Sequence, residues 1–152
     1  MGIIGCGLMG SGIAETVARA GQTVVFLEAS EELVERGRTR IETSTLRAVE
    51  RGRLETAERD TLLGRISGTT DVHELADVDL VIEAATEDHD TKVGMFRRLD
   101  EVTKPDVILA SNTSSIPIAD LGAATSRPDK VLGMHFFNPV PVMGLIELVR
   151  AI

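Results

Sequence analysis

MGIIGCGLMGSGIAE, residues 1–15, is the stretch that decides the predicted fold. The apolar GII leads into Gly5, Gly7 and Gly10, spaced as G-x-G-x-x-G, and a run of small residues follows. In a strand–loop–helix turn of this kind, the first glycine takes the tight bend, the second lets the backbone approach a pyrophosphate, and the third lets the helix pack closely on the strand. The sequence therefore predicts a phosphate-binding turn, against the alternative of a glycine-rich turn that binds nothing.

Glu28 is a second indication of a dinucleotide. The stretch QTVVFLE, residues 22–28, predicts a buried strand that ends at this carboxylate, 18 residues after Gly10. A carboxylate at that place accepts hydrogen bonds from the ribose hydroxyls of NAD and would repel the 2′-phosphate of NADP. We therefore expect a site that favours NAD, with NADP as the alternative.

Strands and helices alternate along the rest of the chain. Helices are predicted over 8–20, 31–51, 55–64 and 88–103 and within 116–125, and further strands over 66–71, 79–85, 106–112, 130–137 and 144–152. Such alternation predicts an α/β fold of Rossmann type, a doubly wound, mostly parallel sheet with helices on both faces. Residues 31–64 exceed what a minimal βαβ crossover needs. We therefore expect a helical excursion after the second strand that projects from the body.

Composition limits the class of protein. The length of 152 residues suits one domain, and 43% apolar with 26% charged residues is typical of a globular protein rather than a disordered one. The formal net charge of -8 argues against a general nucleic-acid binder, which needs a basic surface. It is compatible with an anionic ligand that backbone N–H groups hold.

Cysteine usage and hydropathy exclude several kinds of site. The single Cys6 excludes a disulfide within the chain, and no His/Cys cluster has the spacing of metal ligands, so we expect no metal. No apolar run approaches the roughly 18–20 residues of a membrane span, and the first residues lack the pattern of a signal peptide. We therefore expect no membrane association and a cytoplasmic location.

A histidine and a glutamate near the end of the chain predict acid–base chemistry. His135 ends a predicted strand, and Glu147 is the one carboxylate in the apolar stretch LIELV. A lone carboxylate in an apolar strand is costly unless it is paired, and a turn between Pro139 and Gly144 would bring the two side chains together. A carboxylate bonded to an imidazole fixes its tautomer, which makes a general base. The alternative is that Glu147 points to solvent from an edge strand and His135 is an ordinary strand-end residue.

The polar stretch SNTSS, residues 111–115, also follows a predicted buried strand and should lie at the same edge of the sheet. Its side chains can bond a substrate oxygen or the carboxamide of a nicotinamide. The alternative is a polar turn in which Ser114 or Ser115 caps the next helix. A Ser-His-Glu hydrolase is disfavoured, because the G-x-S-x-G elbow of those enzymes is absent.

Four stretches together resemble one family. GIIGCGLMGSGIAE, VIEAATED, ILASNTSSIPI and GMHFFNPVPVMGLIELV, in this order and spacing, resemble the NAD-binding domain of the 3-hydroxyacyl-CoA dehydrogenases, which include the 3-hydroxybutyryl-CoA dehydrogenases. The resemblance covers essentially the whole chain, and SNTSS and HFFNPVPVM are its most specific parts. It implies NAD-dependent oxidation of an (S)-3-hydroxyacyl-CoA to a 3-ketoacyl-CoA, or the reverse reduction, in fatty acid metabolism.

The resemblance also implies residue roles. His135 matches the catalytic base and Glu147 its acidic partner, while Ser114 and Asn138 match positions that bond the substrate oxygen and hold the site. The cofactor-binding positions that it implies, together with the glycine turn, are Gly5, Gly7, Leu8, Met9, Gly10, Glu28, Ala85, Glu87, Lys92, Asn112 and Ser114. The helical excursion matches a helical tail near the CoA, with Ser44, Arg51 and Arg53 as its candidate contacts.

The family has a second, helical domain that forms the dimer and closes over the substrate, whereas this chain stops at Ile152. We therefore expect residues 1–152 to be the NAD-binding Rossmann domain of a longer, homodimeric enzyme, with a complete cofactor half and a half-built acyl-CoA site. Two alternatives stay open: the dinucleotide-binding domain of another hydroxy-acid dehydrogenase, and a fragment that binds NAD without catalysis.

Overall fold

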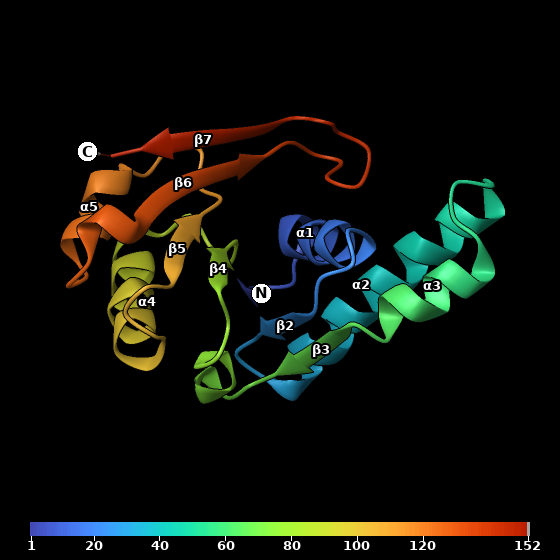
Figure 1. The fold of residues 1–152 in the computed structure, drawn as a ribbon, viewed down its shortest axis with the longest axis horizontal. Coiled ribbons are helices and arrows are strands. Elements are labelled where there is room, and N and C mark those ends of the chain that lie inside the picture. Colours follow the sequence, from blue (N-terminus) through green and yellow to red (C-terminus); the bar gives the residue numbers. More distant parts are fainter. Residues whose placement is uncertain (152) are drawn as a thin grey trace.

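Strand β1 (Gly2–Ile4), which precedes the glycine turn, lies in the interior of a seven-stranded sheet. The structure is a computed structural model and describes residues 1–151. The strand order is β3-β2-β1-β4-β5-β6-β7, with β1 to β6 parallel and β7 antiparallel to β6 (Figure 1). This arrangement confirms the predicted Rossmann-type, doubly wound sheet. The other strands are β2 (Val24–Leu27), β3 (Ile66–Thr69), β4 (Leu80–Glu83), β5 (Ile108–Ser111), β6 (Val131–Phe136) and β7 (Ile146–Arg150).

Helices connect the parallel strands. Ser30 caps the longest of them by accepting a hydrogen bond from the Leu33 amide, and acidic residues lie in its first turn. Two 3-10 turns lie where no helix is predicted from the sequence, η1 (Val72–Leu75) and η2 (Pro128–Lys130). The α-helices are α1 (Leu8–Arg19), α2 (Glu31–Glu50), α3 (Thr56–Leu63), α4 (His89–Val102) and α5 (Ile118–Ala123). Within the described residues, none of these helices combines the length and the apolarity that crossing a bilayer requires.

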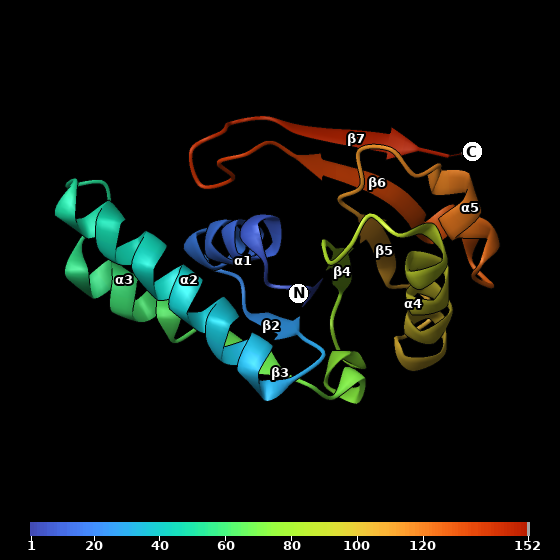
Figure 2. The same cartoon turned by 180° about the vertical axis from the view of Figure 1, so that it is seen from behind.

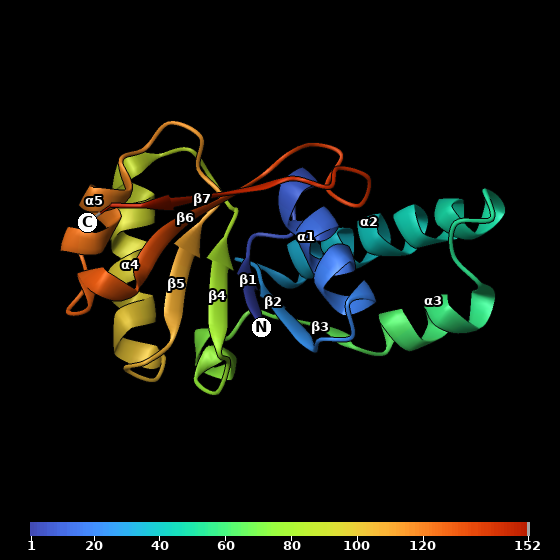
Figure 3. The ribbon, with the colours of Figure 1, turned by 45° about the horizontal axis from the view of Figure 1, so that its top comes forward.

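Both faces of the sheet are covered. Ile3 and Ile82 belong to a buried apolar cluster with residues of α1 and α2, whereas their neighbours Ile4 and Val81 belong to a second cluster with residues of α4 and α5. Adjacent residues of a strand point to opposite faces, so the central strands must be apolar on both sides. Figure 3 shows β5, β4, β1, β2 and β3 following one another across the molecule.

The excursion after β2 is an α2–α3 pair that extends away from the sheet (Figures 1 and 2). Buried Ile41 of α2 and Leu62 of α3 share the cluster that includes β1, so the base of the pair is packed on the body. Arg59 of α3 donates from Nε to Thr45 Oγ1 of α2 at 3.1 Å, which ties the two helices together. The predicted helical excursion is therefore confirmed.

Strands β6 and β7 form the expected hairpin. Its register places His135 opposite Glu147, and Met134 opposite Leu148. β7 is the edge strand, and all five of its residues are exposed. The hairpin therefore carries its acid–base candidates on an accessible edge of the sheet.

Candidate active site

The carboxyl ends of β1 and β4 face a topological switch point. From β1 the chain moves outward through β2 to β3, and it then returns to place β4 on the other side of β1. Loops that leave neighbouring strands in opposite directions open a crevice there, where ligands of such sheets bind. The glycine turn, residues 84–88, residues 112–117 and residues 137–145 all leave strands at this edge or close to it.

The glycine turn has the geometry of a close backbone approach. Gly5 has φ +81, in the region that favours glycine, and its amide donates to the Leu27 carbonyl at 2.9 Å. A Cβ on Gly10 would lie 1.8 Å from the Gly5 carbonyl oxygen, so α1 packs against the turn itself. A Cβ on Gly7 would meet nothing within 4 Å, so Gly7 faces open space. That space lies at the N-terminal end of α1.

A dinucleotide fits this cradle. Gly7 is the N-cap of α1 and supplies no side-chain bond, so the first-turn N–H groups, which include those of Leu8 and Met9, are available to an anion. Glu28 lies beside the turn and accepts from the Cys6 amide through Oε1 at 2.5 Å, which leaves Oε2 for a ribose hydroxyl. These residues would hold the pyrophosphate and the adenosine ribose of NAD, whose nicotinamide supplies or accepts a hydride.

Cys6 is not a nucleophile in this turn. Burial, and then the nearby charge of Glu28, raise the pKa of its thiol to about 12. A thiol with such a pKa stays protonated near neutral pH, and the protonated form is unreactive. Among the described residues, no group of three His, Cys, Asp or Glu side chains could hold a metal ion.

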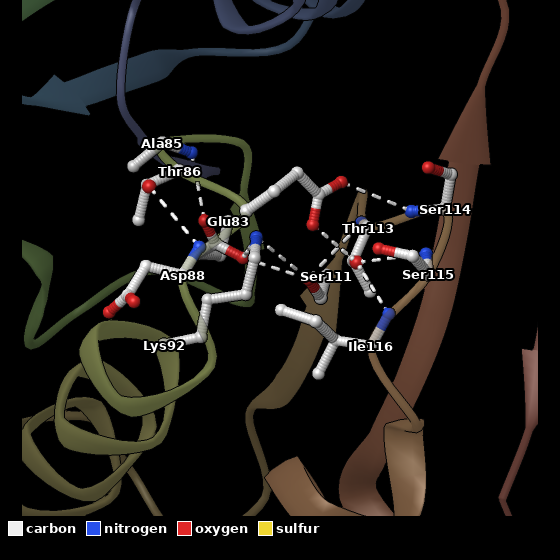
Figure 4. A network of polar contacts seen from close by, with 11 residues as sticks. Glu83, Ala85, Thr86, Asp88, Lys92, Ser111, Thr113, Ser114, Ser115 and Ile116 are labelled. Carbon is white, nitrogen blue, oxygen red and sulfur yellow. Dashed lines mark hydrogen bonds and ion pairs between the residues drawn. The ribbon is translucent and has the colours of Figure 1, made fainter.

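A buried polar network lies under the crevice (Figure 4). Glu83, at the end of β4, accepts from the Ala85 amide at 2.8 Å and from Ser111 Oγ at 2.7 Å, and forms an ion pair with Lys92 Nζ. Lys92, expected to line the cofactor pocket, is 2% exposed and directs its ammonium group to Glu83. Sequence reasoning missed Glu83 and Ser111. The signal for Glu83 was a lone carboxylate in the apolar run LVIEAA, the same signal that singled out Glu147.

Glu87 holds the SNTSS turn. Its carboxylate accepts from Thr113 Oγ1 at 2.7 Å and from the Ser114 amide at 3.2 Å. The helix-capping alternative for Ser114 and Ser115 is wrong, because the N-cap position of α5 is Pro117, which has no side-chain bond. Thr113 Oγ1 accepts from the amides of residues 115 and 116 instead. The Ser114 side chain therefore stays exposed, where a substrate or a cofactor can reach it.

His135 and Glu147 contact each other across the hairpin. Nδ1 of the imidazole lies 3.3 Å from Oε2 of the carboxylate, and the side chains are 25% and 61% exposed. Both alternatives hold in part, since Glu147 lies on an exposed edge strand and is also paired. A carboxylate only accepts, so the proton of a neutral imidazole lies on Nδ1 and Nε2 keeps its lone pair. Asn112 Oδ1 accepts from the Phe136 amide at 2.9 Å, which joins the SNTSS turn to the strand that carries His135.

A cleft of about 530 Å³ opens between α1, α2 and residues 138–142. Asn138 lines it, and so do Ser44, Arg51 and Arg53, the predicted CoA contacts. Four further charged residues line the cleft and are not predicted from the sequence, namely Glu15, Arg19, Arg40 and Arg47. Ser44 Oγ donates to the buried carboxylate of Glu15 at 2.5 Å, and this bond orients the Ser44 hydroxyl. The cleft is thus lined by five arginines and one carboxylate, and this excess of positive charge suits a ligand with several phosphate groups.

Known proteins are similar to this chain in sequence. The family model described as 3-hydroxyacyl-CoA dehydrogenase, NAD binding domain, matches residues 1–152. The 3-hydroxybutyryl-CoA dehydrogenase of Mycobacterium tuberculosis (strain ATCC 25618 / H37Rv) is 54% identical over 153 residues, which cover 100% of this chain and 54% of that protein. The probable 3-hydroxybutyryl-CoA dehydrogenase of Deinococcus radiodurans is 48% identical over 98% of this chain and 53% of its own length.

A solved structure has the same fold. The crystal structure of (S)-3-hydroxybutyryl-CoA dehydrogenase PaaH1 from Ralstonia eutropha superposes with a TM-score of 0.97 at 46% identity, covering 99% of this chain and 53% of that one. The chain therefore spans about half the length of the proteins that it matches.

Proposed function

Since the chain belongs to the 3-hydroxyacyl-CoA dehydrogenase family, through its NAD-binding domain, we propose that it forms the cofactor half of an enzyme that interconverts (S)-3-hydroxyacyl-CoA and 3-ketoacyl-CoA. The observation that carries the proposal is the His135–Glu147 pair, which is joined through Asn112 to the edge of the sheet that holds the glycine turn. A base beside a nicotinamide site can take a hydroxyl proton while the carbon-bound hydrogen leaves as hydride.

In this proposal His135 Nε2 accepts the proton of the 3-hydroxyl group during oxidation and returns it during reduction. Glu147 keeps the proton of the ring on Nδ1 and stabilises the imidazolium that forms. Ser114 and Asn138 bond the substrate oxygen, and Glu87 holds the turn that carries Ser114. The electron pair of the breaking C–H bond goes to the nicotinamide, and the proton of the hydroxyl goes to His135, so the step balances.

The arginine-lined cleft supports a CoA thioester rather than a free acid. Arg51 and Arg53 line this cleft, and so does Asn138, which lies two residues after β6, the strand that carries His135. A phosphate-rich CoA in this cleft would direct its acyl end toward His135. A hydroxy-acid dehydrogenase that acts on free acids would have no use for a cleft with this charge.

The test is loss of NADH absorbance with 3-ketoacyl-CoAs of graded length, using the protein in its natural length. The matched control is the same series of free 3-keto acids. We expect turnover of the CoA thioesters and at least 100-fold lower kcat/KM for the acids. Equal rates with both would favour the non-CoA dehydrogenase. NADH binding without turnover of either would favour a module that binds NAD without catalysis.

We further propose that the natural-length enzyme is a cytoplasmic homodimer. Reduced, buried Cys6 suits a reducing compartment, and the dimer rests on the family resemblance. Sedimentation of the natural-length protein tests the oligomeric state, and a monomer at micromolar concentration would contradict it.

A further inference from the structure

Glu83 is a buried carboxylate that the proposed reaction does not use. Its side chain is 0% exposed at the end of β4, and it accepts from three donors on three different segments of the chain. Oε1 takes the Ala85 amide, while Oε2 takes Ser111 Oγ of β5 and Lys92 Nζ of α4. Figure 4 shows these groups converging on the one carboxylate.

Stability alone does not explain this ion pair. Both charged side chains are almost completely buried, and the removal of two charges from water costs as much free energy as their attraction returns. Apolar residues of similar volume often replace such pairs without loss of stability. A buried charged network that is fully hydrogen-bonded does, however, hold its members in one arrangement.

The groups that Glu83 holds shape the cofactor crevice. Ala85 packs against the glycine turn so closely that a Cβ on Gly5 would lie 2.6 Å from its Cα atom. Ser111 Oγ accepts from the Thr113 amide at 3.3 Å, and Thr113 Oγ1 in turn accepts from the amides of residues 115 and 116, at the end of the SNTSS turn. The Glu83 carboxylate therefore holds Ala85 beside the glycine turn and also holds, through Ser111 and Thr113, the turn that carries Ser114.

We propose that Glu83 is a positioning residue of the dinucleotide site, which holds the loops after β4 and β5 in the geometry that NAD requires. The inference rests on the proposed binding of NAD. A glutamine at this place has a single acceptor oxygen and cannot serve Ala85 and Lys92 together. Glu83→Gln therefore leaves one of these donors without its partner.

The matched control is Asp100→Asn. Asp100 forms an ion pair with Arg127, with side chains 14% and 8% exposed, toward the other end of α4. Both variants break a carboxylate–cation pair that is buried or largely buried, but only Glu83 lies beside the crevice. A merely structural role predicts the same outcome for both variants: lower stability and unchanged affinity of the folded protein for NADH.

Fluorescence titration of the chain with NADH measures the affinity for the cofactor. The chain contains no Trp or Tyr whose fluorescence would interfere. We expect Kd to rise at least tenfold in Glu83→Gln and less than twofold in Asp100→Asn. A change below twofold in Glu83→Gln overturns the proposal, and so does an equal rise in both variants. If the unmodified chain does not bind NADH, the proposed function fails, and the next measurement still decides the role of Glu83.

Amide hydrogen exchange in the absence of NADH measures how firmly the loops after β4 and β5 are held. In Glu83→Gln the Ala85 or the Thr113 amide should exchange at least tenfold faster relative to amides within β4, whereas Asp100→Asn leaves both unchanged. Unchanged exchange at both amides overturns the proposal. If Glu83→Gln does not fold, Ser111→Ala keeps both charges and removes one bond to Glu83. It should then raise Kd at least threefold and speed exchange at Thr113, and no change in either overturns the proposal.

Discussion

His135 and Glu147 face each other across the β6–β7 hairpin, with 3.3 Å between Nδ1 and Oε2. The pair depends on antiparallel register, because a slip of one residue would turn Glu147 to the other face of the sheet. The Phe137 ring lies 4.7 Å from the imidazole, centroid to centroid, at 60°, and restricts the ring on another side. The imidazole is thus oriented by a carboxylate and an aromatic ring while Nε2 stays available.

Replacement of His135, the proposed base, should strongly lower turnover and spare cofactor binding. In the natural-length protein, we expect His135→Gln to lower kcat by about 10²–10⁴-fold, the usual scale for loss of a general base. The glycine turn follows β1, which β4 and β5 separate from the His135 strand β6, so the Kd for NADH should change less than twofold. Turnover within threefold of the unmodified protein would remove His135 from the mechanism.

Glu147→Gln should have a smaller effect on the same step. The glutamine oxygen can still accept from Nδ1, but it carries no charge to stabilise the imidazolium. Because Glu147 is 61% exposed, solvent screens its charge, and we expect kcat to fall about tenfold with KM unchanged. Steady-state kinetics of the natural-length protein test this split, and a rise in KM at constant kcat would assign Glu147 to substrate binding instead.

Sequence patterns predicted the parts of the site that local rules determine. The glycine spacing and the terminal carboxylate of the second strand predicted the turn and Glu28 beside it, and the Pro139–Gly144 turn predicted the pairing of His135 with Glu147. Local rules failed where long-range contacts decide. Ser114 was a plausible helix cap, but Glu87, 27 residues earlier, holds its amide.

The Glu83 network shows the same limit. Its partner Lys92 lies on the next helix and Ser111 on the next strand, at sequence separations of 9 and 28 residues. Only parallel pairing of β4 with β5, which places Glu83 beside Ser111, brings the three side chains together. A lone glutamate at the end of an apolar run signals that a partner exists, but sequence alone does not identify that partner.

Two glycines of the same turn should respond differently to alanine. Gly10→Ala forces a methyl group against the Gly5 carbonyl oxygen, so we expect a loss of about 1–3 kcal/mol in the free energy of unfolding. Gly7→Ala meets open space and should cost at most about 1 kcal/mol, the scale of an N-cap change. Urea denaturation tests this contrast.

The affinity for NADH should show the complementary pattern. The methyl group of Gly7→Ala would occupy the space in front of α1, so we expect a rise of at least tenfold in Kd although the fold stays stable. Unchanged affinity in the folded Gly7→Ala variant would place the pyrophosphate elsewhere.

Glu28→Ala should weaken the discrimination between the two dinucleotides. Its carboxylate lies beside the glycine turn, bonded to the Cys6 amide, where a 2′-phosphate would meet a negative charge. We expect the ratio of the Kd values of NADPH and NADH to fall at least tenfold in the variant. Fluorescence titration with both cofactors measures the ratio. Equal affinity of the unmodified chain for the two cofactors would contradict the assigned role of Glu28.

The ionisation of Asp100 should make the free energy of unfolding depend on pH in the acidic range. Its carboxylate accepts from Arg127 Nε and from the Ser126 amide, each at 2.7 Å. Burial alone would raise the pKa of Asp100, but the bonds from Ser126 and Arg127 outweigh it and hold the pKa below its ordinary value. A carboxyl group whose pKa is lower in the folded state stabilises the fold above its unfolded pKa, and this stabilisation is lost as pH falls through the folded pKa.

The unfolded pKa of an aspartate is about 3.9, so the contribution of Asp100 should be complete near neutral pH and should be lost progressively as the pH falls below about 4 and through the lower pKa of the folded state. Asp100→Asn removes the titrating group. The variant should therefore be less stable than the unmodified chain near pH 7, and the difference in the free energy of unfolding should shrink as the pH is lowered toward about 3. Urea midpoints at a series of pH values measure this convergence. A difference that stays constant with pH would show that the Arg127 contact does not depend on the charge of Asp100.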